Sequence, residues 1–184
     1  MDVIWEGPQR AFIRHVDLGD GTHAVVAATI DDASFFRGRE FRTFHEFSIP
    51  TGAHIVLRAV TPVNVLLQEF SVEIDAAKLK VEWYSGGTAS GTWSTTLPIF
   101  RTNSTTTVDT SYSPQVVMTT GGDFTGGTKL DVFSLDAGIK KAAAGTGGGE
   151  TNKLGMPPGT YFIRLTNTDG TTCTGVFKAL WDER

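Results

Sequence analysis

Two adjoining runs of alternating apolar and polar residues constrain the fold of this chain more than any other feature. In residues 70–75 and 79–84 every second side chain is apolar: Phe70, Val72 and Ile74, then Leu79, Val81 and Trp83. A period of two places one set of side chains on a buried face of a strand and the other set in water. We therefore expect two strands, joined by a tight hairpin at Asp75-Ala76-Ala77-Lys78.

Turn residues divide the rest of the chain into further short strands. Leu18-Gly19-Asp20-Gly21 predicts a hairpin between Phe12–Val16 and His23–Ile30, and one helical turn is expected at Ile139–Ala144. About ten short strands separated by turns predict an all-β fold, an antiparallel β-sandwich that is jelly-roll-like. We assign this single domain to residues 10–184 and a short N-terminal arm to residues 1–9.

Length and charge limit the classes of partner. The 184 residues suffice for one domain with a sizeable core, and the net charge of −4 argues against a nucleic-acid partner. We find no signal peptide and no run of ~18 apolar residues, so we expect synthesis in the cytoplasm and no membrane partner. The single cysteine, Cys173, lies in an alternating stretch and is predicted to be a buried, inert thiol.

No motif predicts catalysis, a cofactor or a metal. Gly126-Gly127-Thr128-Lys129 has its lysine in the wrong place for a phosphate-binding loop. The four histidines lack zinc-ligand spacing, and the chain has no G-x-S-x-G nucleophile motif. Carboxylates that pair across a cleft, as in glycosidases, cannot be located from one sequence. We therefore predict that the protein is not an enzyme and binds no cofactor.

Two kinds of binding surface remain. Arginine mixed with aromatic residues is typical of protein–protein contacts, although the same mixture also suits nucleic acid. The predicted partner-interface residues are Val3, Ile4, Trp5, Phe35, Phe36, Arg37, Arg39, Arg42 and Trp181. Alternatively, Tyr84 and Trp93, which flank a Gly-Ser loop, stack on sugar rings if they are exposed; packing at the rim of the core is the other interpretation.

Three stretches of the chain are familiar: GREFRTFHEFSIPTGAHIVLRAVTPVNVLLQEFSVEIDAAKLKVEWYSGG, MPPGTYFIRLTN and the final ALWDER. From about Ala11 to Trp181 the chain resembles small virion structural proteins of tailed bacteriophages. It implies a capsid decoration (cement) protein on the outer surface of the virion, which bridges and stabilises subunits of the major capsid protein. Copies of the chain itself, for example in a trimer, are also expected partners. The alternative is a receptor- or glycan-binding spike or fibre accessory.

Overall fold

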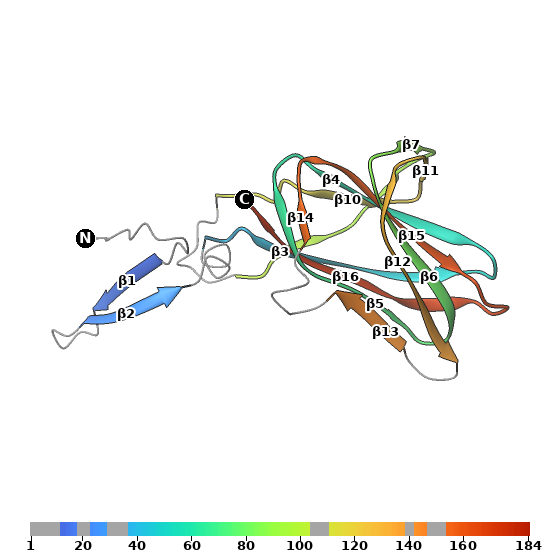
Figure 1. Ribbon diagram of the computed structural model, residues 1–184, viewed down its shortest axis with the longest axis horizontal. Coiled ribbons are helices and arrows are strands. Elements are labelled where there is room, and N and C mark those ends of the chain that lie inside the picture. Colours follow the sequence, from blue (N-terminus) through green and yellow to red (C-terminus); the bar gives the residue numbers. More distant parts are fainter. Residues whose placement is uncertain (1–11, 18–22, 29–36, 104–110, 139–141, 147–153) are drawn as a thin grey trace.

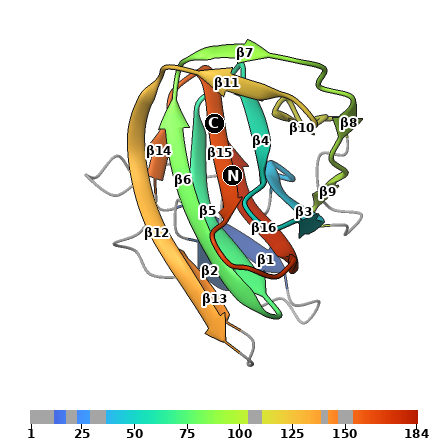
Figure 2. The same ribbon diagram turned by 90° about the vertical axis from the view of Figure 1, so that its right-hand side faces the viewer.

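The computed structural model describes residues 12–17, 23–28, 37–103, 111–138, 142–146 and 154–184. Within these ranges every regular element is a β-strand. The described residues include no helix with the length and apolar character needed to cross a membrane. Most strands belong to two antiparallel sheets that enclose one core (Figures 1 and 2). We call them the β3 sheet and the β4 sheet.

The β3 sheet has the order β13-β5-β16-β3-β9, and β14 also pairs with β5. Its strands are β3 (Glu40–Ile49), β5 (Val65–Ile74), β9 (Ile99–Arg101), β13 (Ala142–Thr146), β14 (Leu154–Met156) and β16 (Cys173–Glu183). The β4 sheet has the order β12-β6-β15-β4-β10-β8. Its strands are β4 (His54–Thr61), β6 (Ala77–Ser85), β8 (Thr95–Thr96), β10 (Val117–Thr120), β12 (Thr128–Gly138) and β15 (Gly159–Asn167).

Two pairs of strands form separate two-stranded sheets. Strands β1 (Phe12–Asp17) and β2 (His23–Ala28) pair antiparallel with each other, which confirms the predicted N-terminal hairpin. Strands β7 (Thr88–Ser90) and β11 (Asp123–Thr125) also pair with each other and lie together at one end of the sandwich (Figure 2). Along the chain, β3 is the first strand that belongs to either of the two large sheets.

The chain crosses between the two large sheets at nearly every connection. Strands β3, β5, β13 and β16 lie in one sheet, and β4, β6, β12 and β15 lie in the other. Within each sheet, neighbouring strands are not consecutive in sequence, as the orders β13-β5-β16-β3 and β12-β6-β15-β4 show. This arrangement of eight strands in two sheets is that of a jelly roll, and it confirms the predicted fold class.

Two local predictions are wrong. Residues 75–78 do not form a hairpin, because β5 pairs with β13, β14 and β16 whereas β6 pairs with β12 and β15. The chain instead passes from one sheet to the other, with Ala77 at a φ of 74° and the Asp75 N–H donating to the Thr174 carbonyl at 3.0 Å. The helical turn expected at residues 139–144 is also wrong in its described part, since Ala142–Thr146 is strand β13.

The alternating residues meet in the core as predicted. Phe70 of β5 contacts Trp83 of β6 with ring centroids 5.2 Å apart, and Phe177 of β16 at 5.5 Å. All six apolar side chains of the two runs are at most 6 % exposed. Burial on this scale contributes roughly 1.5–3 kcal/mol for each large side chain. Cys173 is fully buried, as predicted, and burial raises the pKa of its thiol.

A buried carboxylate fastens residues 112–116 to the end of β16. The Glu183 carboxylate accepts hydrogen bonds from the Tyr112 hydroxyl at 2.9 Å, the Val116 N–H at 3.0 Å and the Trp181 indole N–H at 3.2 Å. The Gln115 N–H also donates to it, at 2.9 and 3.0 Å. Burial and the neighbouring Glu183 raise the pKa of Tyr112 to about 12. Glu183 itself is only 1 % exposed, so these donors replace water as its partners.

Another acidic side chain lies between two lysines on the outer face of the β4 sheet. Glu82 accepts from Lys129 at 2.5 Å and lies 2.9 Å from the Lys80 ammonium. The hydrogen bond from Lys129 is the largest influence on its pKa, which falls from 4.5 to about 2 although burial acts in the opposite direction. This group therefore stabilises the fold only while it is ionised.

Candidate functional site

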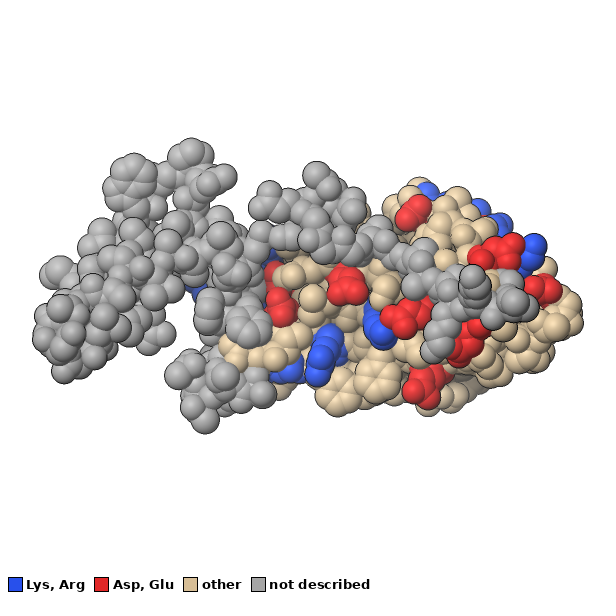
Figure 3. Space-filling view, turned by 90° about the horizontal axis from the view of Figure 1, so that it is seen from below, with Lys and Arg blue, Asp and Glu red and all other residues tan. Residues whose placement is uncertain are grey.

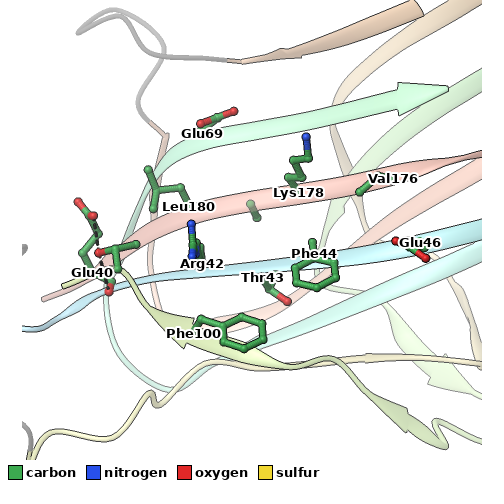
Figure 4. Close-up of a pocket in the computed structure, with 12 residues that line it drawn as sticks. Glu40, Arg42, Thr43, Phe44, Glu46, Glu69, Phe100, Val176, Lys178 and Leu180 are labelled. Atoms are coloured by element: carbon green, nitrogen blue, oxygen red, sulfur yellow. Dashed lines mark hydrogen bonds between the residues drawn. The ribbon is translucent and has the colours of Figure 1, made fainter. Parts of the chain in front are cut away.

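An open hollow of about 880 Å³ lies on the outer face of the β3 sheet. Strands β9, β3, β16 and β5 contribute its walls, and Figure 4 shows their side chains projecting from adjacent strands. We call it the outer hollow. The aromatic and charged side chains that line it include Arg42, Phe44, Glu46, Glu69, Phe100 and Lys178. The alternation along β3 explains the outward set, because Phe41, Thr43 and Phe47 take the buried positions between them.

Two aromatic rings form an exposed platform in the outer hollow. Phe44 is 45 % exposed and Phe100 is 43 % exposed. Their ring centroids are 5.9 Å apart and their planes differ by 6°. They meet because β3 pairs with β9 and places Phe100 opposite Arg42, one outward position from Phe44. Phe100 was not among the residues predicted from the sequence, although alternation with Ile99 puts it on the outer face.

The charges around this platform have both signs. Lys178 pairs with Glu73 at 2.5 Å, and the Glu40 carboxylate accepts hydrogen bonds from Thr102 Oγ1 at 2.6 Å and Gln68 Nε2 at 3.2 Å. Arg42, Glu46 and Glu69 are exposed. Figure 3 shows acidic and basic side chains interspersed with uncharged ones on this side of the molecule. The outer hollow therefore offers hydrogen-bond donors and acceptors next to an apolar surface.

The predicted interface residues do not form one group. Arg37 and Arg42 are exposed, and Arg42 lines the outer hollow. Arg39 is half-buried, with its guanidinium 4.6 Å from the centre of the Tyr112 ring. Trp181 is only 2 % exposed and packs on Phe41 with ring centroids 6.2 Å apart, so its prediction as a contact residue is wrong. The predicted residues Val3, Ile4, Trp5, Phe35 and Phe36 lie outside the described residues.

Both predicted sugar-stacking residues pack against a small apolar cluster that includes Phe124 of the β7–β11 strand pair. Trp93 lies 5.9 Å from Phe162, and the Arg58 guanidinium lies over its ring at 4.5 Å. Tyr84 meets the ring of Phe124 edge to face at 5.0 Å. Both rings are half-buried and part of the cluster that contains Phe124 and Phe162. This geometry favours the interpretation of packing at the rim.

Asp123 holds the β7–β11 strand pair to the sandwich. Its carboxylate lies 2.9 Å from Arg164 of β15 and 3.1 Å from the His54 ring of β4. Burial acts to raise the pKa of Asp123, but hydrogen bonds from the Phe124 N–H, Arg164 and His54 together lower it. This group of charges is thus explained by attachment of the β7–β11 strand pair. Among the residues that the structure describes, no three His, Cys, Asp or Glu side chains lie close enough to hold a metal ion.

Comparisons with known proteins give little similarity. No family model and no curated protein matches the chain. A solved structure of a mutant VP2 protein of infectious bursal disease virus, in derived T=1 particles, aligns at 12 % identity with a TM-score of 0.21. A structure of T=1 particles derived from infectious bursal virus aligns at 12 % identity with a TM-score of 0.20. Each alignment covers 91 % of this chain and 44 % of the other chain, so this chain spans less than half the length of the proteins it matches. Similarity this low supports no inference about function.

Proposed function

We propose that this chain is a non-enzymatic structural protein of a tailed-bacteriophage virion, a decoration protein that bridges major capsid protein subunits on the outer shell. The resemblance noted in residues 38–87, 156–167 and 179–184 suggests this class. The structural observation that supports it best is the apolar edge of the sandwich. On edge strand β12, Leu130 is 44 % exposed and Val132 is 48 % exposed.

An edge strand of this kind is suited to contact another protein. β12 has 11 residues, ends the order of the β4 sheet and pairs with β6 on one side; no other described strand pairs with it. The backbone groups on its outer side can therefore accept a strand from a partner, while Leu130 and Val132 add apolar area. A register irregularity between Lys129 and Asp131 interrupts the pairing at Leu130.

The proposed work is mechanical. Apolar surface buried between the decoration protein and two shell subunits contributes about 25 cal/mol per Å², and this contact must be broken before the shell opens. One such contact is weak by itself. Contacts to subunits that are already held together in a lattice occur at an effective concentration near the millimolar range, which raises the total affinity without new contacts.

The direct test adds purified protein to undecorated capsids and measures occupancy by electron microscopy and the temperature of shell rupture. We expect saturable binding and a higher rupture temperature. The double variant Leu130→Ser/Val132→Ser should bind about tenfold more weakly or worse, because two apolar anchors are lost. Val117→Ser is the matched control: Val117 is 46 % exposed but lies on β10, four strands away from β12 in the sheet order.

Absence of binding to capsids, together with absence of the protein from purified virions, would overturn the proposal. Receptor or glycan binding through Tyr84 and Trp93 receives less support, because Arg58 lies over the Trp93 ring and Phe124 contacts Tyr84. A glycan array on the wild type and on Trp93→Ala tests that alternative directly.

A further inference from the structure

We propose that the outer hollow binds a neutral oligosaccharide. This site is separate from the β12 edge and does not depend on the proposed attachment to capsids. The inference rests on three properties of the hollow: its aromatic platform, the mixed sign of its charges and its concave shape.

The platform consists of the nearly parallel rings of Phe44 and Phe100, each more than two-fifths exposed. An aromatic face carries partial negative charge, and the C–H groups on one face of a pyranose ring carry partial positive charge, so the two attract each other on contact. Stacking also removes apolar area of both partners from water. Two rings side by side extend this surface beyond the width of a single sugar unit.

The polar groups around the platform discriminate against charged ligands. An anionic ligand would meet Glu46 and Glu69, and a cationic ligand would meet Arg42 and Lys178. A sugar hydroxyl both donates and accepts a hydrogen bond, so a neutral polyol can use the carboxylates as acceptors and the cations as donors. Hydrogen bonds of hydroxyl groups to ionised side chains are stronger than those between neutral groups.

The shape separates an oligosaccharide from a flat protein partner. A volume of about 880 Å³ lies within the range of ~300–1,000 Å³ that is usual for small-ligand sites. A flat protein surface laid across the rim would take Arg42 and Glu46 out of water without contacting them fully, and that loss of solvation would weaken the contact. A chain of sugar units can enter the hollow and satisfy these groups.

The test is an array of neutral and sialylated glycans of defined sequence, followed by NMR titration of the full-length protein with each glycan that is retained. We expect neutral glycans to be retained and to shift the ring resonances of Phe44 and Phe100. Phe44→Ala/Phe100→Ala should weaken binding at least about tenfold. Val117→Ala is the matched control, because Val117 is 46 % exposed on β10 of the other sheet and its replacement should leave sugar binding unchanged.

Ionic strength provides a second readout. Because the ligand is neutral, its Kd should change less than about twofold between 50 and 500 mM NaCl, whereas a contact between charged surfaces would weaken strongly. The inference is overturned if the wild type retains no neutral glycan more strongly than the double variant does, or if it retains sialylated glycans preferentially. It is also overturned if Phe44→Ala/Phe100→Ala loses capsid binding while the wild type binds no sugar, since the hollow would then be a protein contact. Failure of the capsid experiment alone leaves the sugar measurements unaffected.

Discussion

Replacing Glu183 by alanine should destabilise the protein far more than removal of any exposed acidic side chain. The substitution leaves the N–H groups of Val116 and Trp181 without their acceptor, and these residues are 4 % and 2 % exposed. Each buried donor that loses its partner costs about 1–3 kcal/mol, which gives roughly 2–6 kcal/mol for the pair. Tyr112 and Gln115 are less buried and regain hydrogen bonds to water, so we do not add them.

One effect opposes this loss. Glu183 is itself buried, and its removal ends the cost of holding a carboxylate away from water. We therefore expect the free energy of unfolding to fall by about 3 kcal/mol, which lies below the middle of that range. For a domain of this size that change lowers Tm by roughly 6–12 °C. Tyr112→Phe removes one of the donors and should cost about 1.5 kcal/mol.

Urea titration monitored by tryptophan fluorescence and by circular dichroism measures these differences, provided that the two probes give the same transition. Glu46→Ala is the control, since Glu46 is exposed in the outer hollow and should change stability by less than about 0.5 kcal/mol. If Glu183→Ala costs no more than Glu46→Ala, the carboxylate does not hold residues 112–116 in place and the reasoning is wrong.

Three further outcomes follow from the packing. The pKa of Glu82 is lowered from 4.5 to about 2, so the stability that this carboxylate contributes is present above pH 4.5 and lost as the pH falls towards 2. The difference in unfolding free energy between wild type and Glu82→Gln should therefore shrink over that interval. The change is at most ~3 kcal/mol and is smaller than that because both lysine partners are half-exposed. Gly175→Ala should lower the free energy of unfolding by about 3 kcal/mol or prevent folding, because a Cβ there would lie 2.2 Å from the Glu73 carbonyl oxygen. Gly155→Ala is the control: its Cβ would meet nothing within 4 Å, so Tm in thermal denaturation should not change. Cys173 should react with a thiol reagent only at the rate of global unfolding, and rapid labelling of the native protein would contradict its burial.

The sequence was sufficient to assign buried and exposed faces wherever the alternation is regular. Trp83 and Cys173 are buried as their positions in alternating runs predict. Trp181 lies in phase with Cys173, Phe177 and Ala179, so the alternation itself places it on the buried face, where the structure has it. Its prediction as a contact residue was wrong because it followed the enrichment of large aromatic residues at protein contacts and not this alternation. The alternation stops only after Trp181, where Asp182 and Glu183 are buried as well.

The candidate site was only partly predictable for a related reason. Arg42 was predicted as an interface residue, and the alternation along its strand puts Phe44 on the same face. The outer hollow also needs Phe100 and Lys178, which are distant in sequence. They join it because β9 and β16 pair on either side of β3. Pairing between distant strands is decided by the packing of the whole sandwich, so a local pattern cannot specify it.

The failed hairpin at residues 75–78 shows most clearly what alternation leaves undetermined. In a hairpin, two adjacent strands bury the same face of one sheet; in a crossing connection, each strand buries the inner face of its own sheet. Both arrangements require the same alternation of apolar and polar residues, because both sheets face one core. Only the connection distinguishes them, and a crossing must span the gap of about 10 Å between sheets, roughly twice the distance between paired strands. Here the crossing uses Ala77 at positive φ and is fixed by the bond from Asp75 to Thr174 of the neighbouring strand. Alanine carries no preference for that conformation, so the contact with β16 must supply the stability that the local sequence does not.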